Sequence, residues 1–372
     1  MSRLKARAEK RRQEAKRQEQ AGFWPELCRR IEEGQVIPII SNSVIFDQIF
    51  DIDNDNILGI NPSGENPQGW TIGEQLADAW AAEVGFPLSE QHWLPRVALF
   101  DRVVNSKDDL AAKSRYLNWL KDSLLYLATD DPEVDPQTIE ELRDDIELNS
   151  FADTVVQLGY PKSVKSEANT LQLLARLKLP VYITTSYYDF LERAILADHR
   201  QPRTQICFWS NEPVTLEDKL HKTDYDFVPT PENPLVYHVF GLEAYPESMV
   251  LNEDDYLNFL AAVAKDAHQK TPILPPYLRK ALTQSSLVLL GYRLRDWEFR
   301  VMFRGLIDTT PDSLRMFNLA IQLDPSHLNA DIAEKVREYL KTYFEDVSFS
   351  VEWDSADGFM RRLWREWDLW RR

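Results

Sequence analysis

Short apolar runs that alternate with helical patterns constrain the fold of this 372-residue chain more than any other feature. The runs are rich in β-branched and aromatic residues and are apolar throughout, which is typical of strands buried on both faces of a parallel sheet. The expected strands cover residues 35–41, 180–186, 205–210, 234–241, 286–292, 316–323 and 347–353. The sequence therefore predicts an α/β fold: a Rossmann-like, mostly parallel sheet with helices on both faces.

A helical block separates the first two expected strands. Thr71 followed by Glu74 matches a capping box, in which each residue's side chain bonds the other's backbone N–H at the start of a helix. Helical patterns in this block cover residues 71–85, 108–128, 135–148 and 168–179. We expect residues from about 71 to 178 to form a helical insertion in the sheet domain.

The first 20 residues differ from the rest of the chain in charge. They carry eight basic and three acidic side chains, whereas the whole chain has a formal net charge of −17. Their residues favour helix but form almost no apolar stripe. We expect a basic helical tail over 1–22 and an α/β domain over 23–372. The tail is either a solvated helix or an arm for an anionic lipid, a nucleic acid or an acidic partner.

Composition narrows the functional classes. The acidic balance disfavours a nucleic-acid binder, because neutralising phosphates requires a cationic face. No apolar run is long enough for a membrane span, and the N-terminus lacks the apolar core of a secretory signal. Two distant cysteines, Cys28 and Cys207, exclude a four-cysteine zinc ribbon. We therefore expect a cytoplasmic protein without a metal site.

Polar and turn-forming residues follow four of the expected strands. Ser41, Asn42 and Ser43 follow the first strand, and Thr184, Thr185 and Ser186 end the second. Ligands of parallel α/β sheets bind beyond the carboxyl ends of the strands. A helix beginning after Ser43 or Tyr188 could hold a phosphate on its free backbone N–H groups. For any one motif taken alone, ordinary capping by Ser, Thr and Asn is the favoured explanation, and neither GxGxxG nor a Walker loop is present.

Taken in order, these strand ends resemble the sirtuin family, and more closely its divergent prokaryotic sirtuin-like branch, which is often found in conflict and antiphage systems. That family has a small-residue loop, a Thr-Thr-Asn-Tyr-Asp loop, a His-Gly pair and a Gly-Tyr turn followed by Asp. The resemblance implies that the chain binds NAD, without a metal. The positions it assigns to NAD binding are Ser41, Asn42, Ser43, Thr184, Thr185, Phe240, Gly241, Gly291, Tyr292 and Asp296.

The chain departs from the family at the positions that carry its chemistry. Ser186 replaces the family asparagine, and Tyr188 replaces the aspartate, although Asp189 is adjacent. Phe240 replaces the catalytic histidine, and His238 lies two residues earlier, on the same side of the strand. The chain also lacks the zinc ribbon of sirtuin deacylases, so the resemblance does not imply a zinc-dependent protein deacylase.

The resemblance implies hydrolysis of NAD to nicotinamide and ADP-ribose. In this hypothesis Ser186 or Asp189 positions the water and His238 assists. The altered positions leave two alternatives open: a non-catalytic nucleotide sensor or scaffold, and an assembly subunit without a ligand. Residues 358–372 combine apolar positions at helical spacing with arginines. This segment either caps the sheet or binds an effector partner or a second copy of the chain.

Overall fold

The computed structural model describes most of the chain. The described residues are 22–50, 70–161, 168–207, 209, 227–266, 274–293, 297–302, 318–322, 330–346 and 348–372. The expected basic tail lies outside these residues, except for its last position. No helix in the described part is long and apolar enough to cross a membrane.

A seven-stranded sheet forms the centre of the molecule, and every neighbouring pair of strands is parallel. The strand order is β3-β4-β2-β1-β5-β6-β7. The strands are β1 (Val36–Ile40), β2 (Val181–Thr184), β3 (Arg203–Ile206), β4 (Leu235–His238), β5 (Ser286–Leu290), β6 (Asn318–Gln322) and β7 (Phe349–Trp353). The predicted α/β fold with a parallel sheet is confirmed, and each expected strand has a counterpart.

The third strand is the one whose position differs most from the prediction. The sequence predicts a strand over 205–210, whereas β3 begins at Arg203 and ends at Ile206. Arg203 and Thr204 are only half-buried, because β3 lies at the edge of the sheet and pairs with β4 alone. The first two residues of this strand are therefore polar, and no apolar run marks where it begins.

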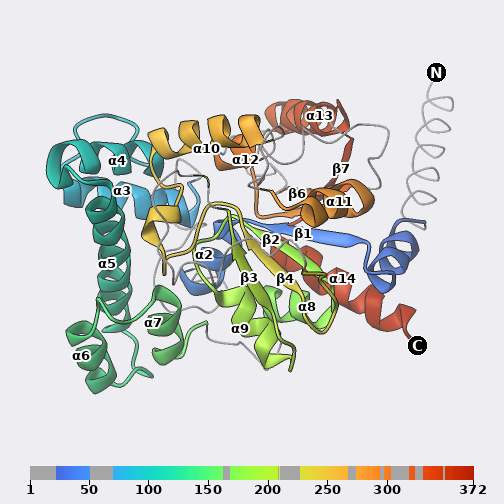
Figure 1. The fold of residues 1–372 in the computed structure, drawn as a ribbon, viewed down its shortest axis with the longest axis horizontal. Coiled ribbons are helices and arrows are strands. Elements are labelled where there is room, and N and C mark those ends of the chain that lie inside the picture. Colours follow the sequence, from blue (N-terminus) through green and yellow to red (C-terminus); the bar gives the residue numbers. More distant parts are fainter. Residues whose placement is uncertain are drawn as a thin grey trace.

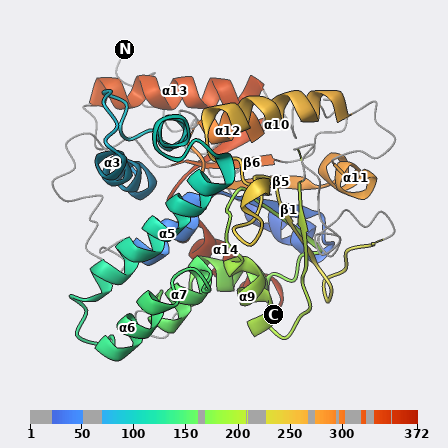
Figure 2. The same cartoon turned by 60° about the vertical axis from the view of Figure 1, so that its left-hand side comes forward.

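Helices cover both faces of the sheet (Figures 1 and 2). One face carries α10 (Glu253–Asp266), α11 (Pro276–Gln284), α12 (Trp297–Met302) and α13 (Ala330–Asp346). The other face carries α8 (Thr170–Arg176), α9 (Phe190–Ala197) and α14 (Ala356–Trp370). On α14, Phe359, Leu363 and Trp367 are buried, so this helix packs its apolar stripe inward.

Except for α8, the helices between β1 and β2 gather at one end of the sheet (Figure 1). After α2 (Asn42–Phe50) they are α3 (Ile72–Val84), α4 (Leu94–Phe100), the π-helix η2 (Asp101–Ser106), α5 (Asp109–Ala128), α6 (Pro136–Asp144) and α7 (Phe151–Gln157). The expected capping box begins α3: the Thr71 hydroxyl accepts from the Glu74 N–H at 3.0 Å, and the Glu74 carboxylate accepts from the Thr71 N–H at 2.6 Å. We call the segment from α3 to α8 the insertion.

Four helices have no clear periodic signal in the sequence: α2, of which only the start near Ser43 was expected, α4, α7 and α11. Each has seven to nine residues. A segment of two turns contains too few apolar repeats for its periodicity to be read. These helices form because the sheet and the longer helices bury them, as the buried Ile45, Phe46 and Ile49 of α2 show.

The central strand is where the chain reverses direction across the sheet. All five residues of β1 are buried, and β1 pairs with β2 on one side and β5 on the other. The chain builds β2, β3 and β4 on the first side before it crosses to β5. Such a switch point opens a crevice at the carboxyl ends of the central strands.

Candidate functional site

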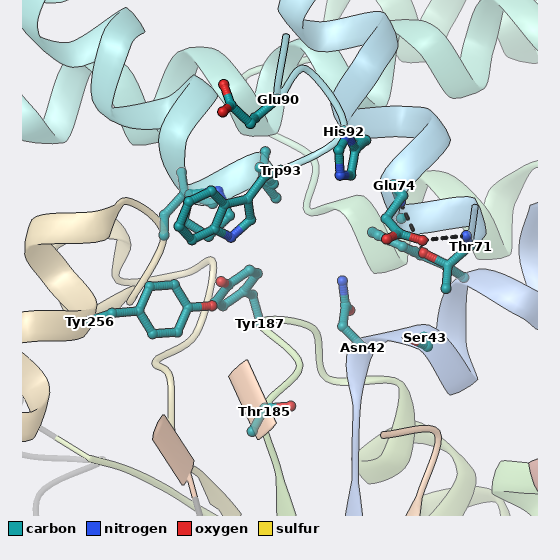
Figure 3. Close-up of a pocket in the computed structure, with 15 residues that line it drawn as sticks. Asn42, Ser43, Thr71, Glu74, Glu90, His92, Trp93, Thr185, Tyr187 and Tyr256 are labelled. Carbon is teal, nitrogen blue, oxygen red and sulfur yellow. Dashed lines mark hydrogen bonds between the residues drawn. The ribbon is translucent and has the colours of Figure 1, made fainter. Parts of the chain in front are cut away.

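A cavity of about 420 Å³ lies beside this switch point, beyond the carboxyl ends of β1 and β2 (Figure 3). This volume is within the range of about 300–1,000 Å³ that is typical of ligand pockets. Four residues that follow the two strands line one side: Asn42 and Ser43 at the start of α2, and Thr185 and Tyr187 in the loop before α9. We call these four residues the floor.

The insertion lines the opposite side. Thr71, Gly73 and Glu74 come from the start of α3, and the segment 90–95 contributes Glu90, His92, Trp93, Leu94 and Pro95. We call these eight residues the roof. Phe46, Leu251 and Tyr256 complete the lining. Aromatic rings and a few polar side chains therefore surround one space, as in many small-molecule sites.

Hydrogen bonds orient the floor. The Ser186 hydroxyl donates to Asn42 Oδ1 at 3.1 Å, so the amide nitrogen of Asn42 is left to point into the cavity (Figure 3). The Thr185 hydroxyl is 3.0 Å from the hydroxyl of Tyr292, and the Tyr187 hydroxyl donates to the Val250 carbonyl at 2.7 Å. The donors and acceptors of the floor are thus presented in defined directions.

A buried ion pair lies beneath the floor. His238 is fully buried, with Nδ1 2.8 Å from the Ser186 carbonyl oxygen and Nε2 2.8 Å from Glu192 Oε1. Both partners are oxygens that accept hydrogen bonds, which favours an imidazolium that donates from both nitrogens. Burial by itself lowers the pKa of His238, but the charge and hydrogen bond of Glu192 outweigh it and raise the pKa above its usual value.

Two positions that depart from the family pattern lie in aromatic clusters. Tyr188 is almost fully buried, with its ring 4.7 Å from that of Phe151, and burial raises the pKa of Tyr188 well above its usual value. Phe240 is fully buried and packs edge-on against Tyr256 and Phe259, each at 5.3 Å between ring centroids. Phe240 therefore supports Tyr256, which lines the cavity, from behind.

Two glycines in this region have positive φ and permit close packing within the chain. Gly291 has φ +80°, and a Cβ there would lie 2.5 Å from Ser41 Oγ and 2.6 Å from Val44 Cγ2. Gly241 has φ +88°, and a Cβ there would lie 2.3 Å from the Ser248 carbonyl oxygen. Only glycine fits either position, and in both the close neighbour belongs to the protein.

Three consecutive acidic residues at the start of α10 hold the insertion over the cavity. Glu253 pairs with Arg96 at 3.1 Å, and Asp254 pairs with Arg102. Asp255 lies 3.3 Å from the buried Lys113. The insertion thus contributes the basic partners Arg96, Arg102 and Lys113, and α10 contributes the acidic partners Glu253, Asp254 and Asp255. Only the last pair is buried on both sides.

The roof carries groups that can exchange protons. Glu74 is engaged in the capping box, and Glu90 lies 3.6 Å from Arg96. The His92 ring stacks on Trp70, with centroids 5.0 Å apart. Within the described residues, no group of three or more His, Cys, Asp or Glu side chains could hold a metal ion. The chemistry of the cavity thus rests on amide, hydroxyl, carboxylate, imidazole and aromatic groups.

The structure brings only some of the predicted site residues together. Asn42, Ser43 and Thr185 line the cavity. Ser186 lies outside the lining and donates a hydrogen bond to Asn42. The carboxylate of Asp189 pairs with Arg193 at 2.8 Å. The predicted residues outside the lining are Ser41, Thr184, Ser186, Asp189, His238, Phe240, Gly241, Gly291 and Tyr292. Asp296 lies outside the described residues.

The sequence does not indicate that the roof residues belong to a ligand site. Thr71 and Glu74 were visible as a capping box, but that motif predicts a helix start and gives no reason to expect a ligand. The segment that contains Glu90, His92 and Trp93 has no recognisable pattern. A histidine and a tryptophan one position apart, just before a short helix, were the only available signal.

Comparison with known proteins locates the family resemblance in the second half of the chain. A family model described as a SIR2-like domain matches residues 180–347, from the start of β2 to the end of α13. This match supports a sirtuin-like relationship and, in general terms, an NAD-related function. The match does not include β1, α2 or the insertion. No curated protein matches the chain.

Proposed function

We propose that this protein binds NAD in the cavity at the carboxyl ends of β1 and β2. The observation that carries the proposal is the position of the cavity, because ligands of parallel α/β sheets bind beyond the carboxyl ends of the central strands. The SIR2-like match includes β2 and the loop that carries Thr185 and Tyr187. The match thus supports the proposal for the part of the cavity that these two residues line.

The lining suits the parts of such a nucleotide. Asn42 and Ser43 begin a helix of nine residues, whose first backbone N–H groups lack intrahelical acceptors and favour a phosphate. The Asn42 amide and the Thr185 hydroxyl can bond ribose hydroxyls. Trp93, Tyr187 and Tyr256 offer aromatic surface to a flat heterocycle. NAD, whether substrate or ligand, supplies the glycosidic bond on which any reaction would take place.

The geometry best supports a sensor or scaffold, which binds NAD and does not use the predicted catalytic residues to cleave it. Both nitrogens of His238 are bonded within the protein, and the ring does not line the cavity. Phe240 cannot accept a proton. The Ser186 hydroxyl donates to Asn42 and accepts from the Tyr188 N–H at 3.2 Å, so it is already committed to holding the floor.

NAD hydrolysis is the second candidate, and the roof is the observation that favours it. Glu90 and His92 line the cavity and belong to residue types that can take a proton from water. In such a reaction the bond from ribose C1′ to the nicotinamide nitrogen breaks, and its electron pair stays with the released nicotinamide. The water oxygen bonds to C1′, and its proton passes to the base on the roof.

The cellular role that we propose follows the resemblance to the conflict and antiphage branch. The protein would act in the cytoplasm, where NAD is abundant, and would respond to infection through an effector partner or a second copy of itself. The exposed end of α14 supports such a contact, because Leu369 and Trp370 are both exposed there. Plating of phage on cells with and without this protein tests the role directly.

Two measurements on the purified full chain test the biochemical proposal. A calorimetric titration with NAD should show saturable binding, and Asn42→Ala should weaken it about tenfold or more because the amide faces the ligand. Incubation with NAD, followed by detection of free nicotinamide, distinguishes sensor from hydrolase. Absence of binding would overturn the proposed function, and release of nicotinamide would favour hydrolysis over sensing.

A further inference from the structure

The carboxylates that line the cavity give it an acidic character. Glu74 lies at the start of α3 and Glu90 in the segment before α4, and both belong to the roof. Among the described residues of the lining, none is a lysine or an arginine. Even a protonated His92 would leave this lining with a net negative charge. The lining therefore disfavours an anionic part of a ligand and favours a cationic one.

Aromatic rings line the same cavity. Figure 3 shows Trp93, Tyr187 and Tyr256 together on one side of the cavity, with Glu74 on the other side. The Tyr187 hydroxyl is bonded to the Val250 carbonyl at 2.7 Å, so Tyr187 offers mainly its ring to a ligand. A flat cation is attracted to such rings, because the face of an aromatic ring carries negative charge.

A cation of the protein itself already lies beside this aromatic side. The Arg96 guanidinium is 4.5 Å from the centroid of the Trp93 ring, but Arg96 is not part of the lining. Arg96 is paired with Glu253 at 3.1 Å and lies 3.6 Å from Glu90. One arginine and two glutamates together carry a net negative charge. Arg96 therefore does not reverse the charge of the cavity.

The parts of NAD differ in how well they suit such a lining. The diphosphate is anionic and adenine is uncharged, whereas the oxidised nicotinamide ring is a flat pyridinium cation. The reduced nicotinamide ring of NADH is uncharged, and the rest of the molecule is the same. The oxidised nicotinamide ring is therefore the part that an aromatic, acidic cavity favours most.

We propose that the cavity selects the nicotinamide ring in its cationic, oxidised form, and that Glu74 is the specificity-determining residue for this charge. Coulomb attraction acts across the cavity, so the carboxylate need not touch the ring. This inference rests on the proposed function, because it needs NAD in the cavity. It assigns the choice between oxidation states to the insertion, which lies outside the SIR2-like match.

Calorimetric titration of the purified full chain with NAD and with NADH measures this preference. We expect the wild type to bind NAD about fivefold or more tightly than NADH. In Glu74→Gln the ratio of the two affinities should fall by about threefold or more, because the attraction to the cationic ring is lost. Glutamine preserves the capping box, since its amide oxygen can also accept from the Thr71 N–H. A structural defect at the start of α3 would instead weaken both ligands alike and leave the ratio unchanged.

Glu83→Gln is the matched control. Glu83 lies on the same helix, is exposed and is not part of the cavity lining. The substitution removes an equal charge, so the ratio should stay at the wild-type value. Equal thermal unfolding of both variants and the wild type will show that they are folded. If the wild type releases nicotinamide, carba-NAD replaces NAD in each titration, because it keeps the pyridinium ring but resists hydrolysis.

The outcomes separate this inference from the function on which it rests. If the wild type binds NAD and NADH equally well, the inference is wrong while the proposed function stands. If Glu74→Gln keeps the wild-type ratio, or if Glu83→Gln lowers the ratio as much, the role of Glu74 is wrong. If the wild type binds neither NAD nor NADH, the proposed function fails and the inference fails with it.

Discussion

The floor and the roof of the cavity are built in different ways. The floor rests on buried groups: Thr184, Ser186 and His238 are each 3% exposed or less. The roof is attached to α10 largely through ion pairs that solvent reaches, since the side chains of Arg96 and Arg102 are 34% and 28% exposed. Regions held by solvent-exposed contacts open at lower free energy than regions held by the core.

This difference indicates how the site can work. A floor that is part of the sheet domain's core gives the ligand a rigid surface and opens only when the protein unfolds. A roof held by partly exposed ion pairs can open locally to admit a ligand. The pair of Lys113 and Asp255 is the exception, because both side chains are buried. It joins α5 of the insertion to α10.

Breaking the ion pair beneath the floor should have the largest effect on stability. In Glu192→Ala, His238 loses the carboxylate at 2.8 Å, and Thr204 loses an acceptor at the same distance. We expect the free energy of unfolding to fall by about 3–5 kcal/mol, because a buried imidazolium would remain without its partner. Urea denaturation measures this change. Glu334→Ala, at a side chain 79% exposed, is the control and should change it by less than about 0.5 kcal/mol.

Close packing behind the floor is tested with two glycines of similar backbone conformation. Gly291 and Gly85 have φ values of +80° and +72°, but only at Gly291 would a Cβ meet other atoms. Gly85→Ala should cost about 1–2 kcal/mol for its left-handed backbone. Gly291→Ala should cost about 2–4 kcal/mol, since it also presses on Ser41 and Val44. Equal losses in thermal or urea unfolding would mean that the packing against Gly291 is loose.

Glu243 lies where the floor meets the insertion. Its N–H donates to the Tyr187 carbonyl at 2.8 Å, and its carboxylate accepts from the Phe151 N–H at the start of α7. Burial raises the pKa of Glu243 to about 7, although the bond from Phe151 opposes this.

This raised pKa predicts a pH dependence of stability with a definite sign. Between about pH 4.5 and 7 the unfolded chain loses the Glu243 proton before the folded chain does, so the folded state binds more protons. The contribution of this group to stability therefore falls by about 1–3 kcal/mol as pH rises through this window. Glu243→Gln should remove that fall. Urea denaturation at pH 5 and pH 8 checks it, with the exposed Glu232→Gln as the control that keeps the wild-type slope.

Loosening the roof should have the smallest effect on global stability. Arg96→Ala should cost only about 0.2–1 kcal/mol, because its partner Glu253 is 24% exposed and the pair is screened by solvent. Local opening should nevertheless increase, and hydrogen exchange of residues 86–95 should accelerate. Arg361→Ala on α14, which breaks an ion pair with Asp357 of 2.6 Å, is the matched control. It should leave exchange in the roof unchanged, and unchanged exchange in Arg96→Ala would contradict a mobile roof.

Local sequence predicts the sheet and part of the floor. Apolar runs mark the strands because a strand buried on both faces needs apolar side chains at successive positions. The positions of three cavity residues could be predicted from the strands that they follow, β1 and β2: Asn42, Ser43 and Thr185. The ends of neighbouring parallel strands must meet at one edge of the sheet.

The roles of side chains near those ends were harder to predict. Ser186 and His238 have the residue types of a catalytic pair, yet both turn away from the cavity and bond within the protein. Alternation along a strand predicts the side on which a residue lies, but not whether a neighbouring helix supplies a partner. Glu192 of α9 forms a hydrogen bond with the second ring nitrogen of His238, and nothing in the order of residues indicates that contact.

The sequence by itself determined the parallel α/β sheet, the capping box that begins α3 and the polar residues at the carboxyl ends of the central strands. These features depend on neighbours in the chain or on a single period of apolar residues. Only the tertiary structure decided that His92 faces Asn42 across a cavity and that α10 holds the insertion above the sheet. The physical reason is that these contacts join segments about 50 to 160 residues apart, so they exist only once the sheet has brought the segments together.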